Sequence, residues 1–162
     1  MRSLVILFVL LGTFTVGTET VSMKPVACQF FTNDNAKKII GEDVRGVDGD
    51  EATPDGGRKW TCTFTAVSSE DGPKVFFMLM RNSSEDAAKR LFEEIRQSNK
   101  NHTGFEEWPG VGDEAITHTD GSNFQFLMIR KGLKTIRLKV NPAKGVSMAD
   151  VKTIASSLAS RL

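Results

Sequence analysis

Cys28 and Cys62 are the residues whose chemistry follows most directly from their number and spacing. The chain holds two cysteines, and an even count behind an apolar leader favours a disulfide formed after export. A structural zinc ion needs four nitrogen or sulfur donors at short spacings, and two distant cysteines with two histidines do not supply them. We therefore predict a Cys28–Cys62 disulfide, with no metal and no cofactor.

The two histidines are the next candidates, with His102 in a polar segment and His118 in an apolar one. Neither stands in a recognisable relation to a nucleophile, and no Gly-x-Ser-x-Gly elbow is present. Adjacent acids such as Glu106-Glu107 and Asp113-Glu114 point apart on an extended chain, which does not suit a glycosidase pair. We predict no catalytic residues. The alternative is a small extracytoplasmic hydrolase that uses a histidine with nearby carboxylates.

A run of basic residues without acids lies in segment 130–139: Arg130, Lys131, Lys134, Arg137 and Lys139. The whole chain has 21 basic and 20 acidic residues, which disfavours a general nucleic-acid binder because such proteins carry a clear basic excess. We predict that the run forms a patch that binds an acidic envelope component or an acidic protein surface. The alternative is a solvated face whose lysines protect a strand edge.

The N-terminal segment resembles a secretory signal, with Arg2 followed by the apolar run Leu4 to Leu11. A bilayer span needs about 20 apolar residues, so this run is too short to cross. We predict a signal peptide with a short linker at 1–22, then one exported domain at 23–162 without a membrane span. Alternatives are an uncleaved anchor, a buried strand, or a lipid on Cys28, which Pro25 disfavours. The expected location is secreted or periplasmic, without a lipid anchor.

Hydrophobic periodicity predicts the elements that must position these residues. Helices are expected from Asn33 or Asp34 to Ile40, from Ser83 or Ser84 through Ile95, and from Ser147 onward, each behind a capping residue. An acidic, glycine-rich loop is expected between the first helix and the first strand. Strands are expected at these ranges: 58–66, 75–80, 115–119, 124–130 and 134–140.

Strand 75–80 is apolar on both faces, so Phe76 and Met78 are expected to line a pocket, with Trp108 as a third candidate. The alternative is a helix packed over that face. In strand 134–140, Arg137 and Lys139 are expected to point outward with Thr135, opposite the apolar residues.

The element pattern predicts an α+β fold. We expect a largely antiparallel sheet of five to six strands, with about three helices mainly on one face, in the order α-β-β-(β)-α-β-β-β-α. The function expected for such an exported domain is non-enzymatic binding or association with the cell envelope. A purely structural envelope protein is a third class.

Several short motifs occur in a suggestive order: Ala27-Cys28, Ile39-Ile40-Gly41, Trp60-Thr61-Cys62 and Pro109 to Ala115. In this order, residues 27–162 resemble a family of small exported actinobacterial-type proteins and lipoproteins of unknown function. The resemblance implies the Cys28–Cys62 disulfide and an extracytoplasmic location, and it implies no catalytic residues. The chain departs from many members because it lacks a lipid-attachment signal.

Two segments match the N-glycosylation sequon, at Asn82-Ser83-Ser84 and at Asn101-His102-Thr103. They matter only if the source is eukaryotic, and composition does not decide the source.

Overall fold

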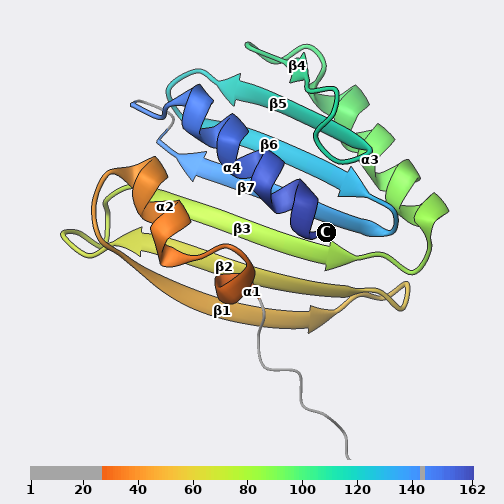
Figure 1. The fold of residues 1–162 in the computed structure, drawn as a ribbon, viewed down its shortest axis with the longest axis horizontal. Coiled ribbons are helices and arrows are strands. Elements are labelled where there is room, and N and C mark those ends of the chain that lie inside the picture. The colour runs from red at the N-terminus through yellow and green to blue at the C-terminus, as the bar shows by residue number, and fades with distance from the viewer. Residues whose placement is uncertain (1–26, 143–144) are drawn as a thin grey trace, which may run out of the picture.

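The structure is a computed structural model that describes residues 27–142 and 145–162 (Figure 1). The predicted signal peptide and linker, residues 1–22, lie outside the described residues. The helices and strands follow one another in this order: α1 (Ala27–Phe30), α2 (Asn33–Ile40), β1 (Val44–Ala52), β2 (Arg58–Ala66), β3 (Lys74–Arg81), α3 (Glu85–Asn99), β4 (Glu106–Glu107), β5 (Glu114–Asp120), β6 (Phe124–Lys131), β7 (Lys134–Asn141) and α4 (Met148–Arg161).

The strands form one sheet of seven in the order β1-β2-β3-β7-β6-β5-β4, and every neighbouring pair is antiparallel. The predicted α+β class and antiparallel sheet are confirmed. The expectation of five to six strands and about three helices is wrong in detail, because the described chain has seven strands and four helices. The additional elements are β1 and the short elements α1 and β4.

β1 occupies the acidic, glycine-rich segment for which the sequence predicts a loop. Its acidity is partly neutralised by β2, because Arg58 donates to both carboxylate oxygens of Asp50, at 2.9 and 2.5 Å. Gly46 allows close packing, since a Cβ there would lie 2.9 Å from the Phe64 ring and 3.1 Å from the Cys62 sulfur. The acids and glycines that indicate a loop thus fit this strand to its neighbour.

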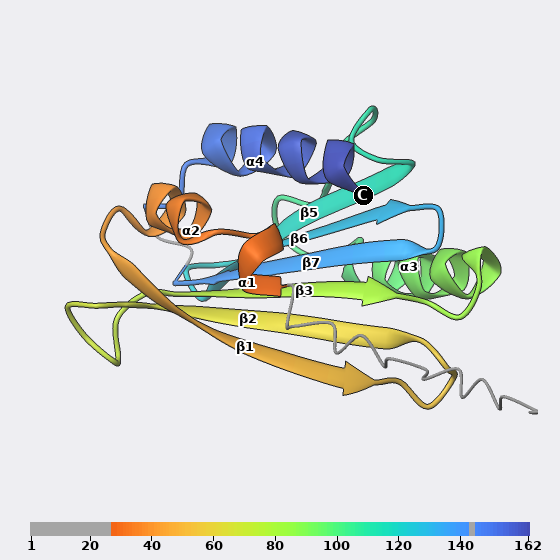
Figure 2. The ribbon, with the colours of Figure 1, turned by 60° about the horizontal axis from the view of Figure 1, so that its bottom comes forward.

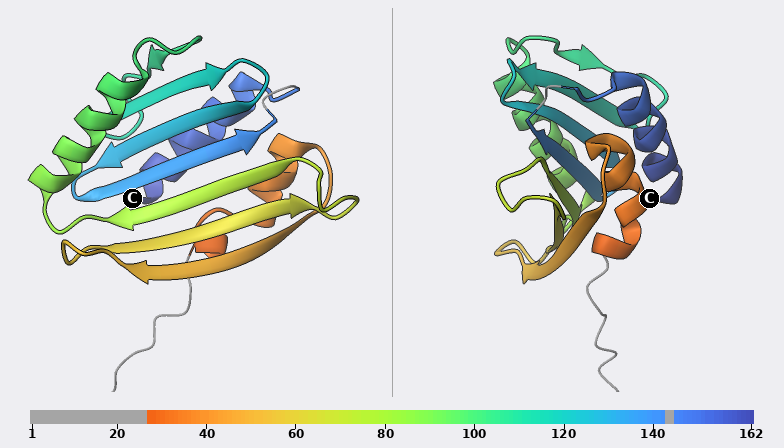
Figure 3. Two further views of the ribbon diagram at one scale, coloured as in Figure 1. Left: turned by 180° about the vertical axis from the view of Figure 1, so that it is seen from behind. Right: turned by 90° about the vertical axis from the view of Figure 1, so that its left-hand side faces the viewer.

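The helices lie on both faces of the sheet. α1, α2 and α4 pack on the front face, and α3 lies alone on the back face, where it crosses one end of strands β5 to β7 (Figures 2 and 3). The main core fills the space under the front helices and includes Phe31, Phe64, Leu127 and Leu158. The prediction that helices lie mainly on one face holds for three of the four described helices.

α3 begins where the sequence predicts. The side chain of its N-cap residue, Ser84, accepts a hydrogen bond of 3.1 Å from the backbone N–H of Ala87. The buried Phe92 of α3 packs against Ile116 of β5 and Met128 of β6, which forms a second, smaller core on the back face. The helix is thereby fixed over one end of the sheet.

The other caps agree with the sequence, with one correction. Ser147 caps α4 as predicted, but α2 is capped by Thr32 instead of Asn33 or Asp34. Thr32 has extended backbone angles and accepts from the N–H of Asn35, and Gly41 ends the helix with a φ of 89°.

The side chains of β7 expected to be exposed to solvent are only partly exposed. Thr135 is buried and Arg137 is half-buried, because both lie on the back face, part of which α3 covers. The expectation that both point into solvent is therefore wrong.

None of the described helices lies on the back face of β1, β2 and β3 (Figure 3). Its apolar side chains are correspondingly exposed, with Val47 of β1 at 63% and Phe76 of β3 at 40%. This half of the sheet exposes large apolar side chains on its uncovered face. The candidate site lies on the same face.

Candidate functional site

A groove lies on the back face beside the part that α3 covers, and we call it the back-face groove. Its volume is about 370 Å³. Its lining combines apolar, hydroxyl and basic residues from four neighbouring strands: Thr61, Thr63, Phe76, Phe77, Met78, Phe126, Arg137 and Lys139.

Strand register explains why these side chains meet. Phe76 of β3 lies opposite Lys139 of β7, which in turn lies opposite Phe126 of β6. The neighbouring row places Met78 opposite Arg137. Since residues two apart on a strand share a face, both rows point to the back face. The groove therefore brings two cations together with aromatic and thioether side chains.

Arg137 is a half-buried cation on the back face. It forms no ion pair with any carboxylate in the described chain, and its Nε is buried without a hydrogen-bond partner. Burial lowers the pKa of the Arg137 guanidinium, although the charge of Glu94 on α3 opposes the shift. An arginine stays protonated in proteins even so, and the groove therefore holds a poorly compensated positive charge.

Lys139 adds a second positive charge. Its Nζ lies 4.0 Å from the centre of the Phe124 ring, a cation–π contact that orients the ammonium group. Lys139 also forms no ion pair within the described residues. The aromatic contact leaves its charge available to an anion.

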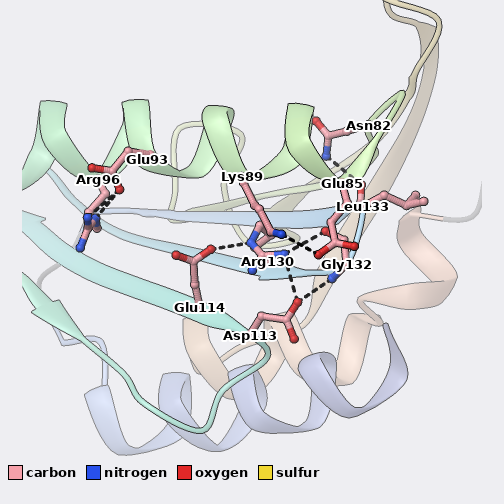
Figure 4. Close-up of polar contacts among 10 residues, drawn as sticks. All are labelled: Asn82, Glu85, Lys89, Glu93, Arg96, Asp113, Glu114, Arg130, Gly132 and Leu133. Carbon is pink, nitrogen blue, oxygen red and sulfur yellow. Dashed lines mark hydrogen bonds and ion pairs between the residues drawn. The ribbon is translucent and has the colours of Figure 1, made fainter.

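The structure does not bring the five predicted patch residues together. Arg130 is 5% exposed and donates to the carboxylates of Asp113 and Glu114 and to the carbonyl oxygen of Gly132 (Figure 4). This arginine is fully engaged in holding the loop before β5 against the β6–β7 turn. It is therefore not available to an external partner.

Lys131 and Lys134 are also engaged within the chain. The Nζ of Lys131 donates to the carbonyl oxygen of Ala159 at 3.1 Å, and that of Lys134 donates to Leu162 at 2.9 Å. Cations at the C-terminal end of a helix stabilise its free carbonyl groups. Two of the five basic residues, Arg137 and Lys139, thus remain at a surface that a ligand can reach.

The three residues predicted to line a pocket do not all lie in the back-face groove. Phe76 and Met78 do line the back-face groove. Trp108 does not, because it is buried in the front core, where its Nε1 donates to Glu106 and Lys152 lies over its ring. Trp108 instead lines a separate cavity, together with Phe92 and Arg96.

Cys28 and Cys62 form the predicted disulfide, with their Cα atoms 5.2 Å apart. The bond links α1 to β2, and the N–H of Cys28 donates to the Asp48 carboxylate at 2.9 Å. Asp48 lies close to both sulfur atoms, as in a metal site. A cysteine binds a metal through its thiolate, however, and both sulfur atoms are bonded to each other in the disulfide.

The two histidines lie against each other with their ring centroids 4.7 Å apart. His118 is 1% exposed, and its Nδ1 has no hydrogen-bond partner. Burial, and secondly the proximity of His102, lower the pKa of His118. No hydrogen bond joins either imidazole to a hydroxyl within residues 27–142 and 145–162. The arrangement therefore gives the hydrolase alternative no assembled nucleophile and base.

Two other cavities are less informative. One, about 710 Å³, lies near the start of the described chain, and the charged residues of its lining are one acid, Asp34, and one base, Arg45. Another, about 450 Å³, lies between Phe92 and Trp108. Its Arg96 forms ion pairs with Glu93, as Figure 4 shows, and with Glu107. Its Asp113 and Glu114 are paired with Arg130.

The two sequons differ in accessibility. Asn82 is buried, and its Nδ2 donates to the carbonyl oxygen of Leu133 at 2.9 Å (Figure 4). Asn101 is exposed in the loop after α3. Only Asn101 of the two is open to modification in the folded chain.

No protein-family model, curated protein or solved structure matches this chain. The resemblance to exported actinobacterial-type proteins therefore stays a prediction. Among the described residues, no helix has both the length and the apolar character needed to cross a bilayer.

Proposed function

We propose that this chain is an extracytoplasmic, non-enzymatic binding domain, and that it holds an anionic ligand in the back-face groove. The observation that carries the proposal is the pair Arg137 and Lys139, two cations without carboxylate partners in the described chain, set among apolar side chains. A concave, mostly apolar site with a few convergent polar groups is the usual form of a small-ligand pocket.

The physical argument concerns compensation of charge. A half-buried guanidinium is costly when it lacks a partner, and a bound anion would offset that cost. Planar guanidinium groups bind carboxylates and phosphates with paired hydrogen bonds, and the nearby ammonium would add attraction. The ligand expected from the sequence, an acidic envelope component, fits this chemistry.

The disulfide supports the extracytoplasmic part of the proposal. Disulfides persist in secreted and periplasmic proteins, and they are rare in the reducing cytosol. The Cys28–Cys62 bond is part of the main core, which suits a lasting structural role.

Anion binding is tested by titrating ¹⁵N-labelled protein with sodium acetate and sodium phosphate at constant ionic strength. Backbone amide shifts should concentrate on β3 and β7 around Phe76, Arg137 and Lys139. They should disappear in the double variant Arg137→Gln/Lys139→Gln. The matched control is Arg90→Gln/Lys38→Gln, which removes exposed charges outside the groove and should leave the shifts unchanged. Absence of shifts in the wild type, or their persistence in the groove variant, would refute the proposal.

A further inference from the structure

We infer that the ligand of the back-face groove is a monocarboxylate with an apolar tail, such as a medium-chain fatty acid or an aryl alkanoate. This inference rests on the proposed function and specifies the chemical class of its ligand. It is argued from three features of the groove: its two cations, its apolar floor and its open side.

The two cations select the head group. Arg137 can present a planar fork to a carboxylate, and Lys139 stands two residues further along the same strand, on the same face. Arg137 is half-buried among apolar side chains, where a singly charged carboxylate costs less to desolvate than a doubly charged phosphate. The lower desolvation cost therefore favours a monoanion.

The floor of the groove selects the tail. Phe76 and Met78 are supplied by β3, and Phe126 closes the side toward β5. Phe76 is 40% exposed, more than is usual for a phenylalanine in the middle of a sheet. Contact with an alkyl or aryl tail would remove this apolar surface from water.

The open side determines how the tail leaves the groove. Beyond Thr61 and Thr63 of β2 lies the exposed Val47 of β1, opposite Thr63 and on the same uncovered face. A tail anchored at Arg137 can thus extend across β3 toward β1 without meeting a helix (Figure 3). The volume of about 370 Å³ is in the range of small-ligand pockets, roughly 300–1,000 Å³, and it suits a short chain better than a folded protein surface.

The experiment is isothermal titration calorimetry of the folded chain with a series of carboxylates from acetate to decanoate, each below its micelle concentration. Affinity should rise by about twofold to fourfold for each added methylene that is buried. Decanol, which lacks the charge, and decyltrimethylammonium, which reverses it, should bind at least tenfold more weakly than decanoate. Decyl phosphate should bind more weakly than decanoate at a pH where it is doubly charged.

Single variants separate the head from the tail. Arg137→Gln should weaken decanoate binding at least tenfold, with Arg90→Gln as the matched control. Phe76→Ser should flatten the dependence on tail length, and the matched control Val67→Ser, at an exposed apolar residue in the turn after β2, should leave it unchanged. Circular dichroism and a urea titration establish that each variant is folded before its binding is compared with that of the wild type.

The outcomes distinguish this inference from the proposed function. If acetate binds at the groove but decanoate binds no more tightly, the groove binds an anion without recognising an apolar tail. The proposed function would then stand, and this inference would fail. If decyl phosphate binds more tightly than decanoate, the head group is wrong. If acetate, phosphate and decanoate all fail to bind, both proposals fail. If phosphate alone binds, the anion site stands and the monocarboxylate is overturned. A dimer that Phe76→Ser dissociates, without decanoate binding, would show that a second copy covers the face and would also overturn the inference.

Discussion

Arg130 and Arg137 show how one residue type takes two roles on one face of a sheet. Both side chains arise on the back face, from the neighbouring strands β6 and β7. Arg130 is bound by Asp113 and Glu114, whereas Arg137 meets no carboxylate among the described residues. The sequence places both in one basic run, because spacing does not reveal which carboxylates will fold against them.

Replacement of Arg130 should therefore affect stability. Arg130→Met removes charge-assisted hydrogen bonds to two carboxylates, and we expect the free energy of unfolding to fall by about 1–3 kcal/mol. The lower part of that range applies if water solvates the half-exposed acids left behind. Urea denaturation measures the change, and Arg90→Met, at an exposed site on α3, should stay within about 0.5 kcal/mol of the wild type.

Replacement of Arg137 should have the opposite profile. Its Nε has no partner to lose, so Arg137→Gln should change the free energy of unfolding by less than about 1 kcal/mol, and in either direction. The same urea titration measures this value. A loss above about 3 kcal/mol would mean that Arg137 supports the fold, which would undermine its assignment to a binding site.

His118 should make stability depend on pH. Its pKa in the folded protein lies below the ordinary value of 6.5, with burial as the main cause, His102 as the next, and Asp120 opposing them. Below about pH 6.5 the unfolded chain therefore binds a proton more readily than the folded chain, so stability falls as the pH decreases toward the folded pKa.

The measurement for His118 is urea denaturation at pH 7.5 and at pH 5.5. The wild type should lose stability at the lower pH, and the neutral variant His118→Gln should lose less. Comparison with the variant separates His118 from the carboxylates, which titrate at lower pH. Equal losses in the two proteins would assign the pH dependence to other groups.

At the scale of elements, alternation and capping residues predict much of the fold. Strand 58–66 coincides with β2, and Ser84 and Ser147 cap helices as expected. The sequence does not predict β1, because its acids and glycines are explained only by contacts with β2 and the disulfide. The sequence does not predict the back-face groove either, because β3 and β7 are distant in the sequence. No local pattern of residues predicts that Phe76 will lie opposite Lys139.

The lysines at the end of α4 give a prediction at this scale. Lys131 and Lys134 donate to carbonyl oxygens at the C-terminal end of the helix, so Lys131→Met/Lys134→Met should destabilise the protein by about 0.5–2 kcal/mol. Thermal unfolding followed by circular dichroism measures the change, with Arg90→Met, at an exposed site away from a helix end, as the control. An unchanged melting temperature would show that these lysines behave as solvated surface charges and do not stabilise the helix.

At the scale of the whole molecule, the disulfide connects the beginning of the described chain to the middle of the β1–β3 half of the sheet. Its loop, on the order of 35 residues, gives an entropic stabilisation of about 3–4 kcal/mol in chain-closure models. Cys28→Ala/Cys62→Ala should therefore lower the free energy of unfolding by about 2–5 kcal/mol, as is typical for native disulfides.

Thiol counting checks the cross-link independently. Protein from its native compartment, unfolded without reductant, should show no reactive thiol, and reduction should release both cysteines. Two reactive thiols before reduction would contradict both the cross-link in the native protein and the proposed extracytoplasmic location.

Methionine methyl groups report directly on whether a ligand occupies the uncovered back face beside Arg137. Met78 lines the groove, whereas Met128 is buried beneath α3 and Met148 lies on the front helix α4. In protein labelled with [methyl-¹³C]methionine, decanoate should shift the Met78 resonance and give intermolecular nuclear Overhauser effects to it. The resonances of Met128 and Met148 should stay in place. An unchanged Met78 signal at saturating decanoate, or a larger shift at Met148, would contradict the account.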